Sequence, residues 1–116
     1  MGYRKLSLYI DGEFVSEGRH RQEVLDPATG QVIGHLPHAT REDLDAALAS
    51  AERAFQDWRR TSPLERSAVL RRVAQLSRER APEIARNMTL DQGKPLAEAM
   101  TEVIACADHA ETRLLA

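Results

Sequence analysis

The chain has 116 residues, enough for one domain or for part of a larger protein. Hydrophobic residues make up 42% of it and charged residues 29%, and a formal net charge of −2 gives no general attraction to nucleic acid or to anionic membranes. It has one cysteine, no apolar run near the roughly 20 residues of a membrane span and no secretory signal pattern, so we expect a cytoplasmic protein without an internal disulfide.

Residues 6–37 have the pattern of β-strands. SLYIDGEFV places an Asp-Gly pair at 11–12 between two apolar arms, which is a strong signal for a short hairpin turn. QEVLDPATGQVIGHL repeats this pattern with a longer turn, in which Asp26 caps the loop, Pro27 fixes φ and Gly30 permits a positive φ. Two hairpins are marginally stable alone and need another element to pack against.

Helical periodicity begins after Pro37. Thr40 to Asp43 reads as a capping box, and a second box pairs Ser62 with Glu65 at the start of the next helix. The first helix has an apolar stripe of Leu44, Ala47, Leu48, Ala51, Phe55 and Trp58. On the second helix, the residues expected to face inward are Val69, Val73 and Leu76.

Prolines predict the remaining helix boundaries. Pro82 would clash with the carbonyl of Arg78, so we expect a kink or a new helix near Ala81 that continues to Leu90. The last helix is expected from about Pro95, with a stripe of Leu96, Ala99, Met100, Val103, Ala107, Ala110 and Leu114. The predicted fold class is α+β, with two hairpins followed by three or four amphipathic helices. The hairpins are too small to cover every stripe, so we expect the stripes to rest on polypeptide outside this chain.

The Gly93-Lys94 pair raises the question of a phosphate-binding loop. Such a loop reads G-x-x-x-x-G-K-[ST], in which backbone amides surround the phosphates and a hydroxyl binds Mg²⁺. Here Met88 stands at the first glycine position and Pro95 at the hydroxyl position. The interpretation we favour is a helix that ends at Gly93 and another that starts at Pro95.

Two groups of residues have side chains suited to catalysis or metal binding. Cys106 and His109 are neighbours on one helix face, as in a thiolate–imidazole pair, but no third group orients the ring, and we favour a packed cysteine beside a solvated histidine. The side chains of His20, His35 and His38 are possible zinc ligands, but the spacing of a metal motif is missing. We therefore favour solvated loop histidines.

Charged residues of the helical region predict a solvated or subunit-facing surface. Glu98 and Glu102 lie at i and i+4, where burial would be needed for acid–base chemistry, and we expect them to be exposed. Carboxylates interleave with the arginines and aromatic residues do not, which argues against single-stranded nucleic acid. These arginines are Arg59, Arg60, Arg66, Arg71, Arg72, Arg78, Arg80 and Arg86. By residue chemistry alone, no complete active site is present.

Three stretches, taken in order, resemble the N-terminal part of the aldehyde dehydrogenase superfamily over roughly residues 8–111. They are LYIDGEFV, the segment from LDPATGQVIGHL to LERSAVL, and TLDQGKPLAEAMTEV. The stretch QGKPLAEAMTEV leans toward the succinate-semialdehyde branch of the family. Family members are several times longer, so the resemblance implies that residues 1–116 are a partial segment of the cofactor-binding domain, without the catalytic and oligomerisation domains.

The resemblance implies NAD(P)-dependent oxidation of an aldehyde to a carboxylic acid by the whole enzyme. In the family a cysteine thiolate attacks the carbonyl, an asparagine and a backbone N–H hold the oxyanion, and a glutamate activates the water that releases the acid. Those residues and the cofactor motif fall outside this chain, so it is expected to be inactive alone and to bind no cofactor. Cys106 corresponds to a helix beside the substrate entrance and is not the nucleophile. The expected partner is the remainder of such an enzyme or a second copy of the chain.

One minor site carries over in part from the resemblance. Some family members bind a monovalent cation through two backbone carbonyls and a carboxylate, which here correspond to Val24, Leu25 and Asp91. Oxygen ligands suit a hard cation, although the remaining family ligand lies outside this chain.

Two alternatives remain open at this point. The alternative function is a free-standing helical module that binds a partner protein through its apolar stripes. The final residues TRLLA also depart from the aromatic-containing helix with which the family continues, which looks like a truncation, a frame change in the gene, a gene-model error or a deliberately chosen end.

Overall fold

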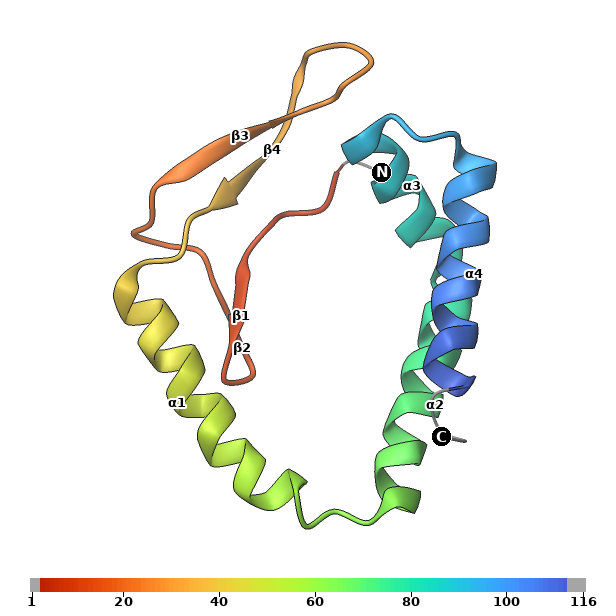
Figure 1. The fold of residues 1–116 in the computed structure, drawn as a ribbon. Helices are drawn as coiled ribbons and strands as arrows, with labels where there is room; N and C mark the ends of the chain where they lie inside the picture. The colour runs from red at the N-terminus through yellow and green to blue at the C-terminus, as the bar shows by residue number, and fades with distance from the viewer. Residues whose placement is uncertain (1–2, 113–116) are drawn as a thin grey trace. The chain divides into compact units, whose positions relative to one another are not determined.

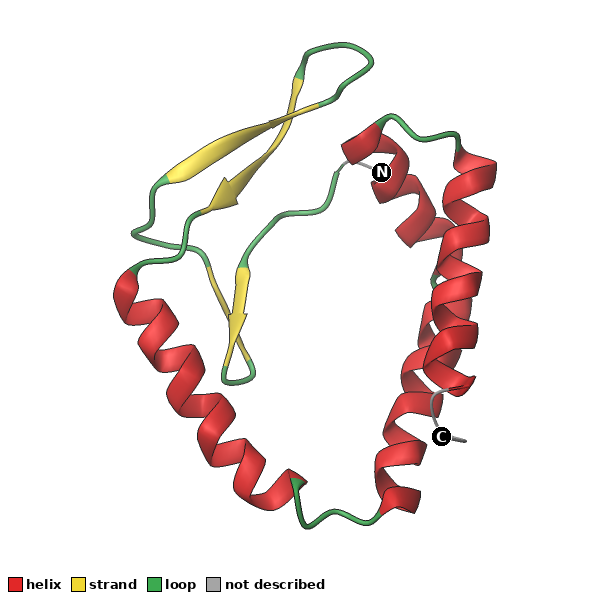
Figure 2. Cartoon of the chain, viewed as in Figure 1, coloured by secondary structure: helices red, strands yellow, loops and turns green. Residues whose placement is uncertain are grey.

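The computed structural model describes residues 3–112, which divide into two compact units. The first unit comprises the chain up to Leu25 and Thr29–Arg60, and the second comprises Asp26–Ala28 and the chain from Thr61 onward. Two antiparallel hairpins and one helix belong to the first unit, and three helices belong to the second (Figures 1 and 2). This composition confirms the predicted α+β class.

The first hairpin pairs β1 (Leu8–Ile10) with β2 (Glu13–Val15). Its turn residues Asp11 and Gly12 have φ values of 52° and 83°. Two successive positive φ angles are typical of the tight turn that an Asp-Gly pair predicts, because glycine adopts them at little cost and aspartate tolerates them. The hairpin prediction is therefore confirmed in place and in turn chemistry.

The second hairpin pairs β3 (Arg21–Leu25) with β4 (Val32–Pro37), and the register shifts between Val24 and Leu25. In the turn, the carboxylate of Asp26 accepts a hydrogen bond of 2.8 Å from the backbone N–H of Ala28. Gly30 has a φ of 70°, so it adopts the positive φ that the sequence pattern permits there.

Helix α1 (Arg41–Trp58) begins at the predicted capping box, with Thr40 as N-cap. The first hairpin is held to this helix by Asp11, whose carboxylate accepts from the hydroxyl of Ser50 at 2.6 Å and pairs with Arg53 at 3.0 Å. The turn of the hairpin therefore lies against the middle of α1.

The second unit contains α2 (Pro63–Glu79), α3 (Ala81–Gln92) and α4 (Leu96–Thr112). Ser62 caps α2 as predicted, and Pro82 stands in the first turn of a new helix at Ala81, which confirms the expected break. Helix α3 runs two residues beyond the predicted end at Leu90. No helix within residues 3–112 has both the length and the apolar character needed to cross a bilayer.

Small side chains form the core of the second unit, where α4 packs against both α2 and α3. The central cluster is Ala81, Ala85, Ala99 and Val103, and the partly buried Ile84, Met88 and Met100 pack against it. Ala74 and Ala107 are also buried. Alanine at these positions lets the helices approach closely, which agrees with the stripe predicted for α4; its last member, Leu114, lies outside the described residues.

Large apolar side chains remain exposed on α1 and α2. On α1 the exposed fractions are 52% for Leu44, 60% for Leu48, 55% for Phe55 and 45% for Trp58. The predicted stripe of α1 is thus a real apolar face that the described residues leave open. We call Leu44, Leu48, Phe55 and Trp58 the α1 apolar face.

The inward orientation predicted for α2 is wrong for two of its three residues. Val69 and Val73 are 50% and 47% exposed, whereas Ala74 is fully buried. The physical reason is that the small Ala74 lies on the side of α2 that packs in the helical core, where a small side chain lets helices approach closely. The larger residues then fall on another side of the helix. Leu96, at the start of the α4 stripe, is likewise 52% exposed.

Candidate functional site

The Gly-Lys-Pro segment forms a helix boundary in the structure. Gly93 has a φ of 72°, and its N–H donates to the carbonyl of Thr89 at 2.8 Å, which closes the C-terminus of α3. The ammonium of Lys94 pairs with the carboxylate of Glu102 on α4. Pro95 lies one residue before α4, and its carbonyl accepts from the N–H of Ala99, so it precedes the first turn rather than standing in it. Lys94 lies between the two helices and is paired with α4, which confirms the interpretation of this segment as a helix boundary.

Cys106 and His109 are both exposed on α4. The expectation of a packed cysteine is wrong, because Cys106 lies on the rim of a hollow rather than in the alanine core. This hollow has a volume of about 290 Å³ and is lined by Ser77, Ile84, Met88, Glu102, Val103 and Cys106. Its walls are mostly apolar, and the solvated histidine is as expected.

The histidines of the first unit make contacts within the hairpin region. The rings of His20 and His38 meet edge to face with centroids 5.2 Å apart, and His38 Nε2 lies 2.9 Å from the amide oxygen of Gln22. His35 stands on β4 opposite Glu23 on β3. Within residues 3–112 no group of three or more His, Cys, Asp or Glu side chains is arranged to hold a metal ion.

Arg78 joins α2 to α4 through two carboxylates. Its guanidinium donates to Glu111 and to Asp108, each at 2.7 Å. These hydrogen bonds, first the one to Glu111, raise the pKa of Arg78, and the guanidinium in turn lowers the pKa of Glu111. Arg78 therefore links two packed helices. This is a structural role, as expected for an arginine among interleaved carboxylates.

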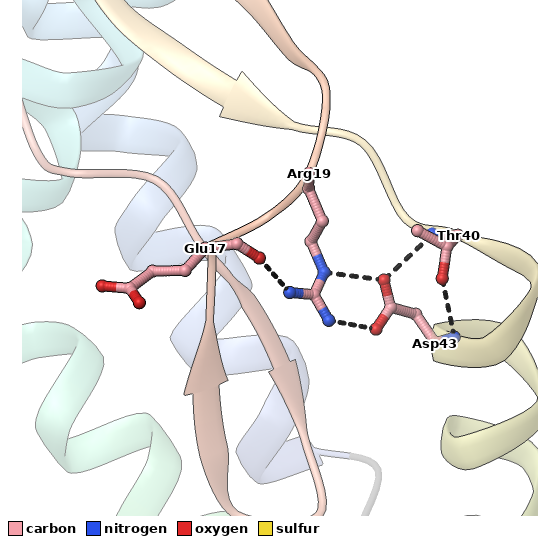
Figure 3. Close-up of polar contacts among 4 residues, drawn as sticks. All are labelled: Glu17, Arg19, Thr40 and Asp43. Atoms are coloured by element: carbon pink, nitrogen blue, oxygen red, sulfur yellow. Dashed lines mark hydrogen bonds and ion pairs between the residues drawn. The ribbon is translucent and has the colours of Figure 1, made fainter.

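A partly buried ion pair between Arg19 and Asp43 is the polar cluster that sequence reasoning missed (Figure 3). Arg19 Nε and Nη2 donate to the two carboxylate oxygens of Asp43 at 2.8 and 2.5 Å. Its third nitrogen, Nη1, donates to the backbone carbonyl of Glu17. The same carboxylate accepts from the backbone N–H of Thr40 at 2.9 Å, so it closes the capping box and the ion pair together.

Hydrogen bonds from Arg19 hold the pKa of Asp43 well below its usual range, and the backbone N–H of Thr40 adds to this effect. The same contact raises the pKa of Arg19. The capping box itself was predictable from Thr40 and Asp43. The partner was not, because Arg19 is 24 residues away and follows an unrelated hairpin.

The residues of the partial cation site fall in different units. Val24 and Leu25 stand at the register shift near the end of β3 in the first unit, and Asp91 lies in the last turn of α3 in the second. The cation site therefore stays a prediction. Within residues 3–112 the contacts described above close helix ends and join elements, and they do not assemble a nucleophile, a base and an oxyanion site.

Comparison with known families identifies the segment. The sequence profile described as the aldehyde dehydrogenase family matches residues 14–114, which is most of the chain. The chain belongs to the aldehyde dehydrogenase family. Members of this family oxidise aldehydes, and the match confirms the resemblance read from the hairpin and Gly-Lys-Pro segments.

Individual relatives agree with this assignment. The chain is 46% identical over 99 residues to the human mitochondrial methylmalonate-semialdehyde/malonate-semialdehyde dehydrogenase [acylating], covering 84% of the chain and 18% of that protein. It is 44% identical over 101 residues to malonate-semialdehyde dehydrogenase from Listeria monocytogenes, covering 86% of the chain and 21% of that protein. This aldehyde dehydrogenase segment thus spans about a fifth of the length of its curated relatives.

The fold of the segment is also that of known family structures. The NAD-dependent aldehyde dehydrogenase from Sinorhizobium meliloti superposes with a TM-score of 0.90 at 32% identity, covering 97% of this chain and 23% of that chain. The hairpins and helices described above therefore recur as part of a larger dehydrogenase.

Proposed function

We propose that the chain is the N-terminal part of the cofactor-binding domain of an NAD(P)-dependent dehydrogenase that oxidises a short semialdehyde. The observation that carries this proposal is the open α1 apolar face in a chain that matches about a fifth of each relative. An apolar helix face of this kind needs a covering surface. The remainder of a dehydrogenase chain is the partner that family membership supplies.

The residues of this chain do not by themselves fit a dinucleotide. The fingerprint G-x-G-x-x-G is absent from the sequence, and Lys94 of the Gly-Lys pair is engaged by Glu102. NAD(P) would therefore be held by polypeptide other than this chain, and the role proposed for the segment is to brace the domain that holds it. The NAD-dependent relative from Sinorhizobium meliloti supports the choice of cofactor.

The substrate class is proposed from the relatives. Both curated relatives are semialdehyde dehydrogenases, which supports a short aldehyde with a carboxylate at its far end. The succinate-semialdehyde branch that the Gly-Lys-Pro segment suggests stays a prediction within this class. The human relative is also named acylating, so the acyl group could pass to an acceptor other than water. We propose a carboxylic acid as the product.

Purified chain, supplied with NAD⁺ or NADP⁺ and with malonate or succinate semialdehyde, is expected to give no NAD(P)H by absorbance at 340 nm. The nucleophile, the base and the cofactor motif are not assigned to any residue of this chain. The matched sample is the malonate-semialdehyde dehydrogenase of Listeria monocytogenes, assayed in the same way for NAD(P)H and for the acid product. Turnover by the isolated chain that disappears in the Cys106→Ser variant would show that the proposed inactivity is wrong.

The alternative of a free-standing interaction module rests on the same exposed faces, and the state of association of the chain decides between the two functions.

We also propose a cytoplasmic location for the whole enzyme. The mitochondrial location in the human relative's name is the competing outcome, and imaging of a tagged full-length protein would distinguish them.

A further inference from the structure

A hollow of about 540 Å³ lies beside the first hairpin, within the first unit. Its lining includes Arg4, Lys5, Ser7, Phe14, Ser16 and Glu17. Small-molecule sites in proteins commonly have volumes of about 300–1,000 Å³. The hollow therefore has the size of a ligand site, and its lining combines cations, hydroxyls and one aromatic ring.

The three cationic side chains that line this hollow differ in whether they already have partners. Arg19 also lines it, but each of its three guanidinium nitrogens already donates a hydrogen bond, two to Asp43 and one to the carbonyl of Glu17 (Figure 3). Arg4 and Lys5 are exposed, and neither makes an ion pair with another residue of 3–112. The opposing charge in the lining is Glu17, whose carboxylate is directed away from Arg19 in Figure 3. Two uncommitted cations against one carboxylate favour an anionic ligand.

Packing of Tyr3 fixes the segment that carries the two cations. A side-chain carbon at Gly34 on β4 would lie 2.7 Å from Cδ1 of Tyr3, so the tyrosine ring lies directly against the glycine backbone. Because Arg4 and Lys5 follow Tyr3 immediately, this contact anchors their backbone to the second hairpin. The cations are thus presented from a docked segment.

Phe14 supplies a flat apolar surface at the same hollow. Its side chain is 70% exposed, and its ring lies 4.9 Å from that of Tyr9, its partner across the hairpin. An aromatic ligand can stack on such a ring, and the hydroxyls of Ser7 and Ser16 can donate to phosphate oxygens. The lining therefore offers separate contacts for a phosphate and for a ring.

We propose that this hollow binds a small phosphate monoester that carries an aromatic ring, of the size of a nucleoside monophosphate. Arg4 and Lys5 contact the phosphate, with Ser7 and Ser16 as additional donors, and Phe14 stacks on the ring. Glu17 weakens the site by charge repulsion. This last feature gives the proposal a test in which one substitution strengthens binding.

AMP is the probe, titrated into the ¹⁵N-labelled full chain at low salt and followed by amide chemical shifts. We expect saturable shifts at residues 4–7 and 14–17. Arg4→Gln and Lys5→Gln should each raise the Kd about tenfold, the loss of one charge-assisted hydrogen bond. Glu17→Gln should lower the Kd. The control is Arg41→Gln on α1, whose side chain is 81% exposed and pairs with Asp45, and it should leave the Kd unchanged.

Four results would overturn the proposal. The first is the absence of saturable shifts with millimolar AMP. The second is an effect of the Arg4 and Lys5 variants no larger than that of Arg41→Gln, which would indicate general ion attraction. The third is equal binding of inorganic phosphate and AMP, which would remove the role of Phe14. The fourth is a spectrum without dispersed hairpin resonances, because the hollow requires the folded hairpin.

Discussion

At the scale of single residues, local sequence rules predict one contact of Asp43, the capping box, and miss the other, the ion pair with Arg19. Thr40 and Asp43 predict a capping box because the two partners are three residues apart and depend only on helix geometry. The same carboxylate also binds a guanidinium from a distant loop. No periodicity or motif in the sequence encodes that contact, since it exists only once the first hairpin docks on α1.

The Asp43 contact predicts a specific pH dependence of the stability of the first unit. The pKa of Asp43 is lowered in the folded state from an ordinary value of 3.8, so its stabilising contribution is present above pH 3.8. It is lost as the pH falls below that value toward the folded pKa. We therefore expect Asp43→Asn to lower the urea midpoint at pH 7, and the difference from wild type to shrink below pH 3.8.

Fluorescence of Trp58, the single tryptophan, monitors this unfolding because it lies at the end of α1. The control is Asp45→Asn on the same helix, whose carboxylate is 61% exposed and pairs with Arg41. Its midpoint should differ little from wild type. A difference between Asp43→Asn and wild type that stays constant from pH 7 to pH 2 would contradict the assignment.

At the scale of helices and strands, the helix starts and the apolar faces of α1 and α4 were predictable, whereas the orientation of α2 was not. Pro82 and the two capping boxes gave the starts of three helices, because each acts within one turn of the backbone. The outward orientation of Val69 and Val73 could not be read from the stripe, because it depends on which side of α2 contacts α4. The Gly-Lys-Pro segment was interpreted correctly as a boundary, since proline and left-handed glycine act locally.

Gly93 offers a prediction at this scale. It adopts a φ of 72°, and an added side-chain carbon would lie 3.1 Å from Cγ of Pro27. Gly93→Ala should therefore lower the free energy of unfolding of the second unit by about 1–2 kcal/mol, the usual cost of a left-handed alanine. Gly93→Asn should cost less, because asparagine tolerates that region. Urea unfolding followed by circular dichroism at 222 nm measures both, with Gln92→Ala as the control, and equal losses for alanine and asparagine would contradict the backbone explanation.

At the scale of the whole molecule, open apolar faces connect the fold to the proposed function. The buried residues of the second unit are alanines and one valine, whereas Leu44, Leu48, Phe55 and Trp58 of the α1 apolar face are all exposed. The sequence predicted this contrast from the number of stripes and the small size of the hairpins. It could not identify the covering surface, because under the proposed function that surface belongs to polypeptide outside residues 1–116.

Isolated chain is therefore expected to associate with itself through the α1 apolar face, and sedimentation velocity over a range of concentrations measures this. The double variant Leu48→Glu with Phe55→Glu should raise the concentration needed for association about tenfold or more, because an unpaired charge buried between chains costs well over 1.4 kcal/mol. Ala46→Glu, an exposed position on the opposite side of α1, is the matched control and should leave association unchanged. Wild-type chain that stays monomeric at every concentration and unfolds cooperatively would instead favour the free-standing module, because such a chain has no need of a covering surface.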